Sequence, residues 1–379
     1  MKIKISELLT RLIICCSLIM LAFTGVIGIE RTKYFLFLIV GLCLLKTVNM
    51  RLTGMQLCAL LMIALSLMLV FALHDATFAN QLIFFASLIF AIDIYHKGID
   101  EGTWNLLKIC TVIACSWFVI SSRSAGAWDQ AGRLELSFGN PNMTGIALSA
   151  PTMILVIMAV EQKSKIIRVV YMGISAVMLY LIYSTENRGS FLTVIAFSVC
   201  AILALGKKKS WRITNKWIYW VFKLLPIIIM VVYVFLYSVL PNDLELLGKP
   251  FFSGRELGWR IALERLAYEP FTYHNFEDGM LNLFLEGMQR YGIFAMIGYI
   301  WILFTFKKQN LKELSVRAYL AYLGFHIFFF QQSFESTLIT GSYSAYVWSY
   351  ILLGVASMKE SGGEVKPYPK DINRLSPME

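Results

Sequence analysis

The chain alternates between long apolar stretches and brief polar groups. Most apolar stretches approach the ~20 residues that an α-helix needs to cross a membrane. Because backbone in lipid must satisfy its own hydrogen bonds, we expect these stretches to be helices. The pattern predicts an all-α, polytopic membrane protein of about twelve transmembrane helices, centred on residues 12–29, 34–45, 55–73, 78–95, 104–120, 142–160, 168–183, 191–205, 217–239, 291–306, 318–334 and 342–357.

The second stretch, 34–45, is short for a span and is bounded by Lys33 and Lys46. It crosses the membrane only if these long side chains extend outward to the water interface. We therefore expect Lys46 to reach the membrane surface.

Composition agrees with this interpretation. The 379 residues are 58% hydrophobic and 15% charged, whereas a soluble domain carries about a quarter of its residues as charged side chains. All seven cysteines fall in apolar stretches, so neither a disulfide framework nor a zinc site is predicted. The formal net charge of +10 could indicate a nucleic-acid partner, but its distribution fits membrane topology better, and no nucleic acid is expected.

Basic residues are dense in alternate polar segments. If the N-terminus is cytoplasmic, the inner segments hold most of them, as the positive-inside rule requires. Both termini are then cytoplasmic and the longest polar segment is external. The predicted organisation is nine spans in 1–239, a large external loop in 240–290 that contains an amphipathic helix, three spans in 291–357, and a cytoplasmic tail in 358–379.

The basic residues also differ in type between the two sides. Inner segments carry mostly lysine, and outer segments carry mostly arginine, including Arg133, Arg188, Arg255, Arg260 and Arg265. Lysine is sufficient to hold a loop in the cytoplasm, whereas the planar guanidinium matches phosphate or carboxylate in two-point contact. Anion binding explains why arginines occur in outer segments, where the positive-inside rule disfavours basic residues. Surface salt bridges with nearby glutamates explain some of these arginines equally well.

The external loop contains a predicted helix. Ser253 and Glu256 fit the S-x-x-E capping box. Trp259, Ala262, Leu263 and Leu266 then share one face, and the helix should end before Pro270, lying on the membrane or capping the bundle. Arg255 falls in the first turn, where the helix dipole disfavours a cation but favours a phosphate beside it.

Other outer residues carry weaker signals. Arg188 lies in a turn with Gly189, which permits close approach to the backbone, and a charge pair with Glu186 is the plainer interpretation. Asn142, after Asn140-Pro141, is a candidate cap for the sixth span. His274 is a candidate general base with Asp278 nearby, or else an exposed loop residue. No metal-binding pattern occurs in the outer loops.

Three motifs together resemble the O-antigen ligase and polymerase superfamily: Phe138-Gly-Asn-Pro-Asn-Met-Thr-Gly145 following Arg133, Asn187-Arg-Gly-Ser190, and Ser253-Gly-Arg255 with Trp259. The resemblance runs from the fifth span to the tenth. It implies joining of glycans outside the bacterial plasma (inner) membrane, from undecaprenyl-pyrophosphate-linked oligosaccharide, without metal or other cofactor. Arg188 and Arg255 would hold the pyrophosphate. Membrane lipid, and a flippase and chain-length regulator of the same pathway, are the further implied partners.

The chain departs from the ligase branch at one position. The histidine expected late in the external loop corresponds to Leu281, and the pair His274-Asn275 occurs roughly two helical turns earlier. The departure favours a polysaccharide polymerase that extends a lipid-linked repeat unit, with His274 or Asp278 as base and Arg133, Asn142, Trp259, Arg260 and Arg265 in support. A ligase and a transporter or flippase of lipid-linked glycans remain the alternatives.

Overall fold

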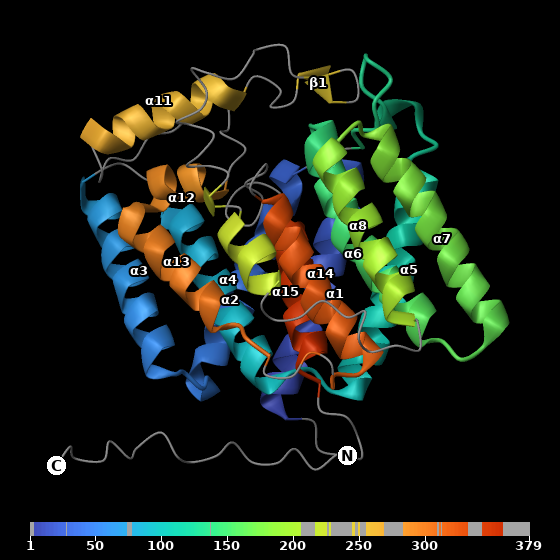
Figure 1. Ribbon diagram of the computed structural model, residues 1–379, viewed down its shortest axis with the longest axis horizontal. Helices are drawn as coiled ribbons and strands as arrows, with labels where there is room; N and C mark the ends of the chain where they lie inside the picture. Colours follow the sequence, from blue (N-terminus) through green and yellow to red (C-terminus); the bar gives the residue numbers. More distant parts are fainter. Residues whose placement is uncertain are drawn as a thin grey trace.

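The computed structural model is an almost entirely helical bundle, drawn in Figure 1. It describes residues 4–27, 29–73, 78–136, 138–205, 217–225, 227–228, 245–246, 249–250, 255–268, 283–308, 311, 313–332 and 343–358. The helices are α1 (Ile5–Ile27), α2 (Ile29–Leu45), η1 (Lys46–Asn49), α3 (Gly54–Leu73), α4 (Phe78–Lys97), α5 (Glu101–Ser121), η2 (Ala125–Ala127), α6 (Pro141–Glu161), α7 (Lys165–Ser184), α8 (Arg188–Leu205), the π-helix η4 (Ile218–Leu224), α11 (Arg255–Tyr268), α12 (Leu283–Tyr291), α13 (Ile293–Thr305), α14 (Val316–Gln331) and α15 (Tyr343–Ala356).

The predicted all-α class holds for the bundle. In the described part of the chain, the only paired strands are β1 (Glu245–Leu246) and β2 (Lys249–Pro250), which form a short antiparallel pair. Each apolar stretch predicted from the sequence contains a helix, although only the first part of 217–239 is described.

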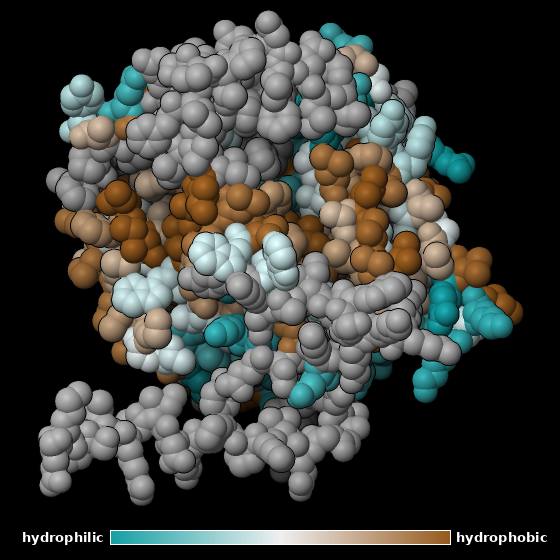
Figure 2. All heavy atoms as spheres, in the orientation of Figure 1, coloured by the Kyte–Doolittle hydropathy of each residue, from teal (hydrophilic) through white to brown (hydrophobic). Residues whose placement is uncertain are grey.

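The long helices have the character of membrane spans. Within the described residues, four helices are long and apolar enough to cross a membrane: Gly54–Ala72, Glu101–Ser121, Pro141–Glu161 and Lys165–Ser184. Figure 2 shows a band of hydrophobic residues across the middle of the visible face, with hydrophilic residues below it. By length and composition these are the helices of a membrane protein; crossing of the membrane by all twelve predicted spans stays a prediction.

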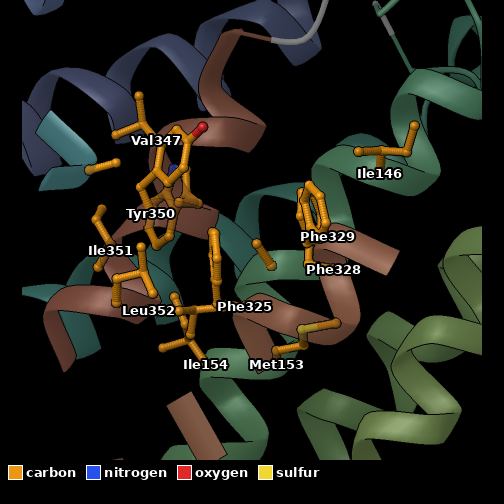
Figure 3. Close-up of a cluster of buried hydrophobic side chains, with 14 of the residues drawn as sticks. Ile146, Met153, Ile154, Phe325, Phe328, Phe329, Val347, Tyr350, Ile351 and Leu352 are labelled. Carbon is orange, nitrogen blue, oxygen red and sulfur yellow. The ribbon is translucent and has the colours of Figure 1, made fainter. Parts of the chain in front are cut away.

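Helix α6 lies at the centre of the bundle. In its most apolar window 83% of the residues are buried, against 17% for the neighbouring α7. Its partners include α5, α7, α8, α14 and α15. Figure 3 shows one part of this core, where Ile146, Met153 and Ile154 of α6 lie close to Phe325 and Phe329 of α14 and to residues of α15. Because α6 is enclosed on nearly all sides, it fixes where its neighbours begin and end.

One end of the bundle is held by ion pairs. The start of α1, the ends of α2 and α4 and the start of α5 meet there. The Arg11 guanidinium lies 2.6 Å from the Asp100 carboxylate, and Lys97 Nζ donates to Ser6 Oγ at 3.4 Å. The backbone N–H of Ile99 donates to Gly354 O, so α15 ends at this same end. Helix α11 lies at the opposite end (Figure 1).

The expectation for Lys46 was wrong. Its side chain is 1% exposed and its Nζ lies 2.8 Å from Asp93 Oδ2. Asp93, which is fully buried, also pairs with Lys97 at 2.5 Å. A carboxylate on a neighbouring helix lowers the cost of burying the ammonium group, so the lysine turns inward instead of extending to water.

Close packing of α13 on α3 depends on a glycine. A Cβ added at Gly298 would lie 2.7 Å from Ile63 Cγ1 and 2.8 Å from the backbone oxygen of Ala59. Small residues at such crossings let two helix backbones approach each other closely.

We expect Gly298→Ala to lower the apparent Tm of the detergent-purified protein, because the added methyl group overpacks the interface at a cost of about 1–3 kcal/mol. Gly173→Ala on α7 is the matched control, since nothing lies within 4 Å of its added Cβ. Equal Tm values for the two variants would contradict the close packing of α3 on α13.

Candidate functional site

Two of the motifs found in the sequence meet at the end of the bundle that carries α11. Asn187 Nδ2, before the start of α8, donates to the backbone oxygen of Asn142 in the first turn of α6 at 3.0 Å. Gly145 makes this contact possible, because an added Cβ there would lie 2.8 Å from Thr185 Oγ1 and 2.9 Å from Asn187 Cβ. The Asn-Pro-Asn segment and the Asn-Arg-Gly-Ser segment therefore form one structural unit.

The start of α6 is capped two residues earlier than predicted. Asn140 is the N-cap, and its Oδ1 accepts from the backbone N–H of Asn142 at 2.7 Å. Pro141 occupies the first helical turn, where its missing N–H costs nothing. Asn142 is thus not the cap; it holds the turn between α7 and α8 through its carbonyl oxygen.

The same turn presents Arg188. Glu186 adopts a left-handed conformation with φ of 55°, which reverses the chain between α7 and α8. Asn187 then caps α8, with its Oδ1 accepting from the Ser190 backbone N–H at 2.9 Å. Arg188 is the first residue of α8 and is half-buried. A guanidinium at the N-terminus of a helix, where the helix dipole is positive, is suited to an anion.

Arg133 has a partner in its own loop. Its Nε and Nη2 both lie 2.8 Å from Asp129 Oδ2. The backbone N–H of Arg133 donates to Asp129 Oδ1, and this bond and the guanidinium hold the pKa of the Asp129 carboxyl below its usual value. The loop docks beside the α7–α8 turn through Leu134 N–H and Ser184 O at 2.8 Å. Arg133 therefore lies near the site, with its charge balanced by Asp129.

Helix α11 caps this end of the bundle. Of its predicted apolar face, Trp259 and Ala262 are buried and Leu263 is partly buried. It packs on α12, where Gln289 Nε2 donates to Ala262 O at 3.4 Å. The helix ends at Tyr268, before Pro270, as the sequence predicts. Arg255 is its first residue, and the Arg265 side chain is exposed.

Hydrogen bonds connect α11 to the α8 turn. Leu283 N–H of α12 donates to Gln332 O after the end of α14 at 3.0 Å. Gln331 Nε2 of α14 donates to Ser190 Oγ of α8 at 2.7 Å. Together with the α11–α12 contact, these bonds place the helices that begin with Arg188 and Arg255 at the same end of the molecule.

Helix α12 supplies polar groups that the sequence did not single out. Glu286 and Gln289 are buried, and Glu286 pairs with Arg290 at 2.9 Å. Within the described residues, Glu286 Oε2, Gln289 Oε1 and Gln331 Oε1 have no hydrogen-bond partner. Such acceptors are suited to sugar hydroxyls. The helical spacing of apolar residues from Leu283 to Tyr291 could have indicated this helix. It was missed because nearly all of the segment falls inside the predicted external loop.

An apolar crevice begins below this arrangement and extends toward the opposite end of the bundle, where Val160, Arg168 and Ile202 line it. It has a volume of about 210 Å³ between α6, α7 and α8, and its walls include Val156, Met172 and Val194. Val194 follows Arg188 along α8 by roughly 9 Å, at 1.5 Å per residue. The crevice therefore runs along the helix whose first residue is Arg188.

Several predicted site residues lie outside the described part of the chain. His274, Asp278 and the predicted cap Ser253 belong to this group, as do the side chains of Arg255 and Arg260. Among the described residues, no group of three or more His, Cys, Asp or Glu side chains could hold a metal ion. No family model, curated protein or solved structure matches this chain.

We expect Asn187→Ala to destabilise the protein by about 1–3 kcal/mol, because it removes the cap of α8 and the side-chain hydrogen bond that ties the α7–α8 turn to Asn142 O. Lower apparent Tm and faster hydrogen exchange in the first turn of α8 would measure this loss. The control is Gln130→Ala at an exposed loop position, which should leave both readouts unchanged.

Proposed function

We propose that this protein is a polysaccharide polymerase of the O-antigen, capsule or exopolysaccharide type. It would transfer a growing glycan from undecaprenyl pyrophosphate to a lipid-linked repeat unit, as a metal-independent glycosyltransferase. The proposal rests on the resemblance to the O-antigen ligase and polymerase superfamily. The observation that carries it is the placement of two arginine-initiated helices, α8 and α11, at one end of a bundle of apolar helices.

The chemistry requires a site for a departing pyrophosphate. A hydroxyl oxygen of the incoming repeat unit attacks the anomeric carbon of the growing chain, and the bond from that carbon to the pyrophosphate oxygen breaks. The leaving group keeps the electron pair, and Arg188 and Arg255 stabilise its charge with helix N-terminal N–H groups. The hydroxyl proton passes to a base, for which His274 and Asp278 are the candidates.

The rest of the molecule suits a lipid-linked substrate. The apolar crevice between α6, α7 and α8 can take part of an isoprenoid chain whose pyrophosphate lies near Arg188. Buried acceptors on α12 and α14 can bind sugar hydroxyls. In this proposal the chain crosses the bacterial plasma membrane twelve times, has both termini in the cytoplasm and presents residues 240–290 outside.

A ligase would use the same donor but join the glycan to another acceptor. A transporter of lipid-linked glycans is favoured by a different observation, the buried ionisable side chains Asp93, Lys46 and His326, since transporters place such groups within their spans. Asp93, however, pairs with both Lys46 and Lys97 near the end of α4, away from the middle of a span. The polymerase therefore remains the better supported function.

The polymerase assignment predicts that purified protein converts lipid-linked repeat units into a ladder of products. Arg188→Lys and Arg255→Lys keep the charge but lose the two-point guanidinium contact, so we expect each to reduce ladder formation about tenfold or more. The products are resolved by gel electrophoresis and mass spectrometry.

Arg123→Lys is the matched control for this experiment. Arg123 is exposed after the end of α5, outside the residues that form the site, and its substitution should leave the ladder intact. A single joined product would indicate a ligase, and substrate movement without any product would indicate a transporter. Full activity in both arginine variants would refute the pyrophosphate roles.

A further inference from the structure

A second binding feature lies at the end of the bundle opposite α11. It is a groove of about 670 Å³ between α5 and the hairpin formed by α6 and α7. Lys108, Asn105 and Ile109 come from α5, and Gln162 and Lys163 come from the turn after α6. In Figure 2 the corresponding turn at the lower right is hydrophilic and lies directly below the hydrophobic band. The groove thus lies where polar and apolar surfaces meet.

The unbalanced charge in this groove is positive. Glu161 lines it but is already engaged, with Oε1 2.8 Å from Arg317 and Oε2 accepting from Trp104 Nε1 at 3.1 Å. Among the described residues, no carboxylate lies within salt-bridge distance of Lys108 or Lys163. The ammonium group of Lys108 instead lies 5.8 Å from the centre of the Trp104 ring.

The Lys108 side chain is half-buried on α5. It lies in the third turn of α5, roughly 10 Å along the axis from Glu101. A half-buried lysine on an apolar helix gains from an anion that enters the same groove.

An apolar surface leads away from the two lysines. Ile109 and Ile113 of α5 line the groove and are 59% and 50% exposed. Ile120, which is 65% exposed, follows farther along the same helix. Charged residues at one end and a continuous apolar track beyond them match a headgroup followed by an acyl chain.

We infer that this groove binds an anionic phospholipid. The phosphate lies between Lys108 and Lys163, Asn105 and Gln162 offer hydrogen-bond partners to the headgroup, and one acyl chain follows Ile109 and Ile113 along α5. The site is separate from the arginine-bearing end and does not depend on the polymerase function.

The test is native mass spectrometry of the full-length protein purified in detergent, with phosphatidylglycerol or phosphatidylcholine added at equal concentrations. We expect selective retention of phosphatidylglycerol. The double variant Lys108→Gln with Lys163→Gln should reduce this retention about tenfold or more, since each lysine near a membrane surface contributes attraction to an anionic lipid. Lys165→Gln is the control, because Lys165 is exposed close by but does not line the groove.

A stability measurement and a competition experiment separate lipid binding from misfolding and from binding of phosphate alone. The apparent Tm without added lipid should be the same for wild type and the double variant, which shows that the fold is intact. Soluble glycerol 3-phosphate should not displace the lipid; if it does so at similar concentration, the site binds phosphate alone and the lipid inference is wrong. Equal retention of both lipids, or unchanged retention by the double variant, also overturns it.

Discussion

The burial of α6 is the constraint on which the rest of the structure depends. Its first turn holds the α7–α8 turn through the Asn142 carbonyl, and its last residue, Glu161, binds Arg317 of α14 and Trp104 of α5. A helix buried along most of its length cannot shift without disturbing its neighbours. The position of Arg188 at one end and of the lysine-lined groove at the other are both set by this one element.

The sequence predicted the helices well because the signal for them is continuous. Stretches of about twenty apolar residues allow little other than a helix in lipid, whatever the details of packing. The presence of α11 and its end before Pro270 were also predicted, and Trp259 and Ala262 of its expected apolar face are buried. By contrast, α12 contains Glu286, Gln289 and Arg290, which read as loop residues until their burial against neighbouring helices is known.

The site was less accessible to sequence reasoning, because it depends on distant residues. The sequence placed Arg255 in the first turn of a helix but Arg188 in a turn, whereas Arg188 is the first residue of α8. That the two arginines belong to helices starting at one end follows only from the contacts through α12 and α14. Asn140 and Asn142 are equivalent cap candidates by residue type, and the backbone geometry alone decides between them. The inward turn of Lys46 likewise depended on Asp93, a partner on another helix.

Basic side chains at the two ends of the bundle can be compared by whether a carboxylate lies against them. At the end opposite α11, many basic side chains lie against carboxylates: Arg11 with Asp100, Lys46 and Lys97 with Asp93, and Arg317 with Glu101 and Glu161. A cation already paired gains little from a further anion, whereas an uncompensated one near an apolar surface gains more. Lys108 and Lys163 are therefore the groups at that end best able to bind an anionic headgroup. At the other end Arg133 is paired in the same way, with Asp129.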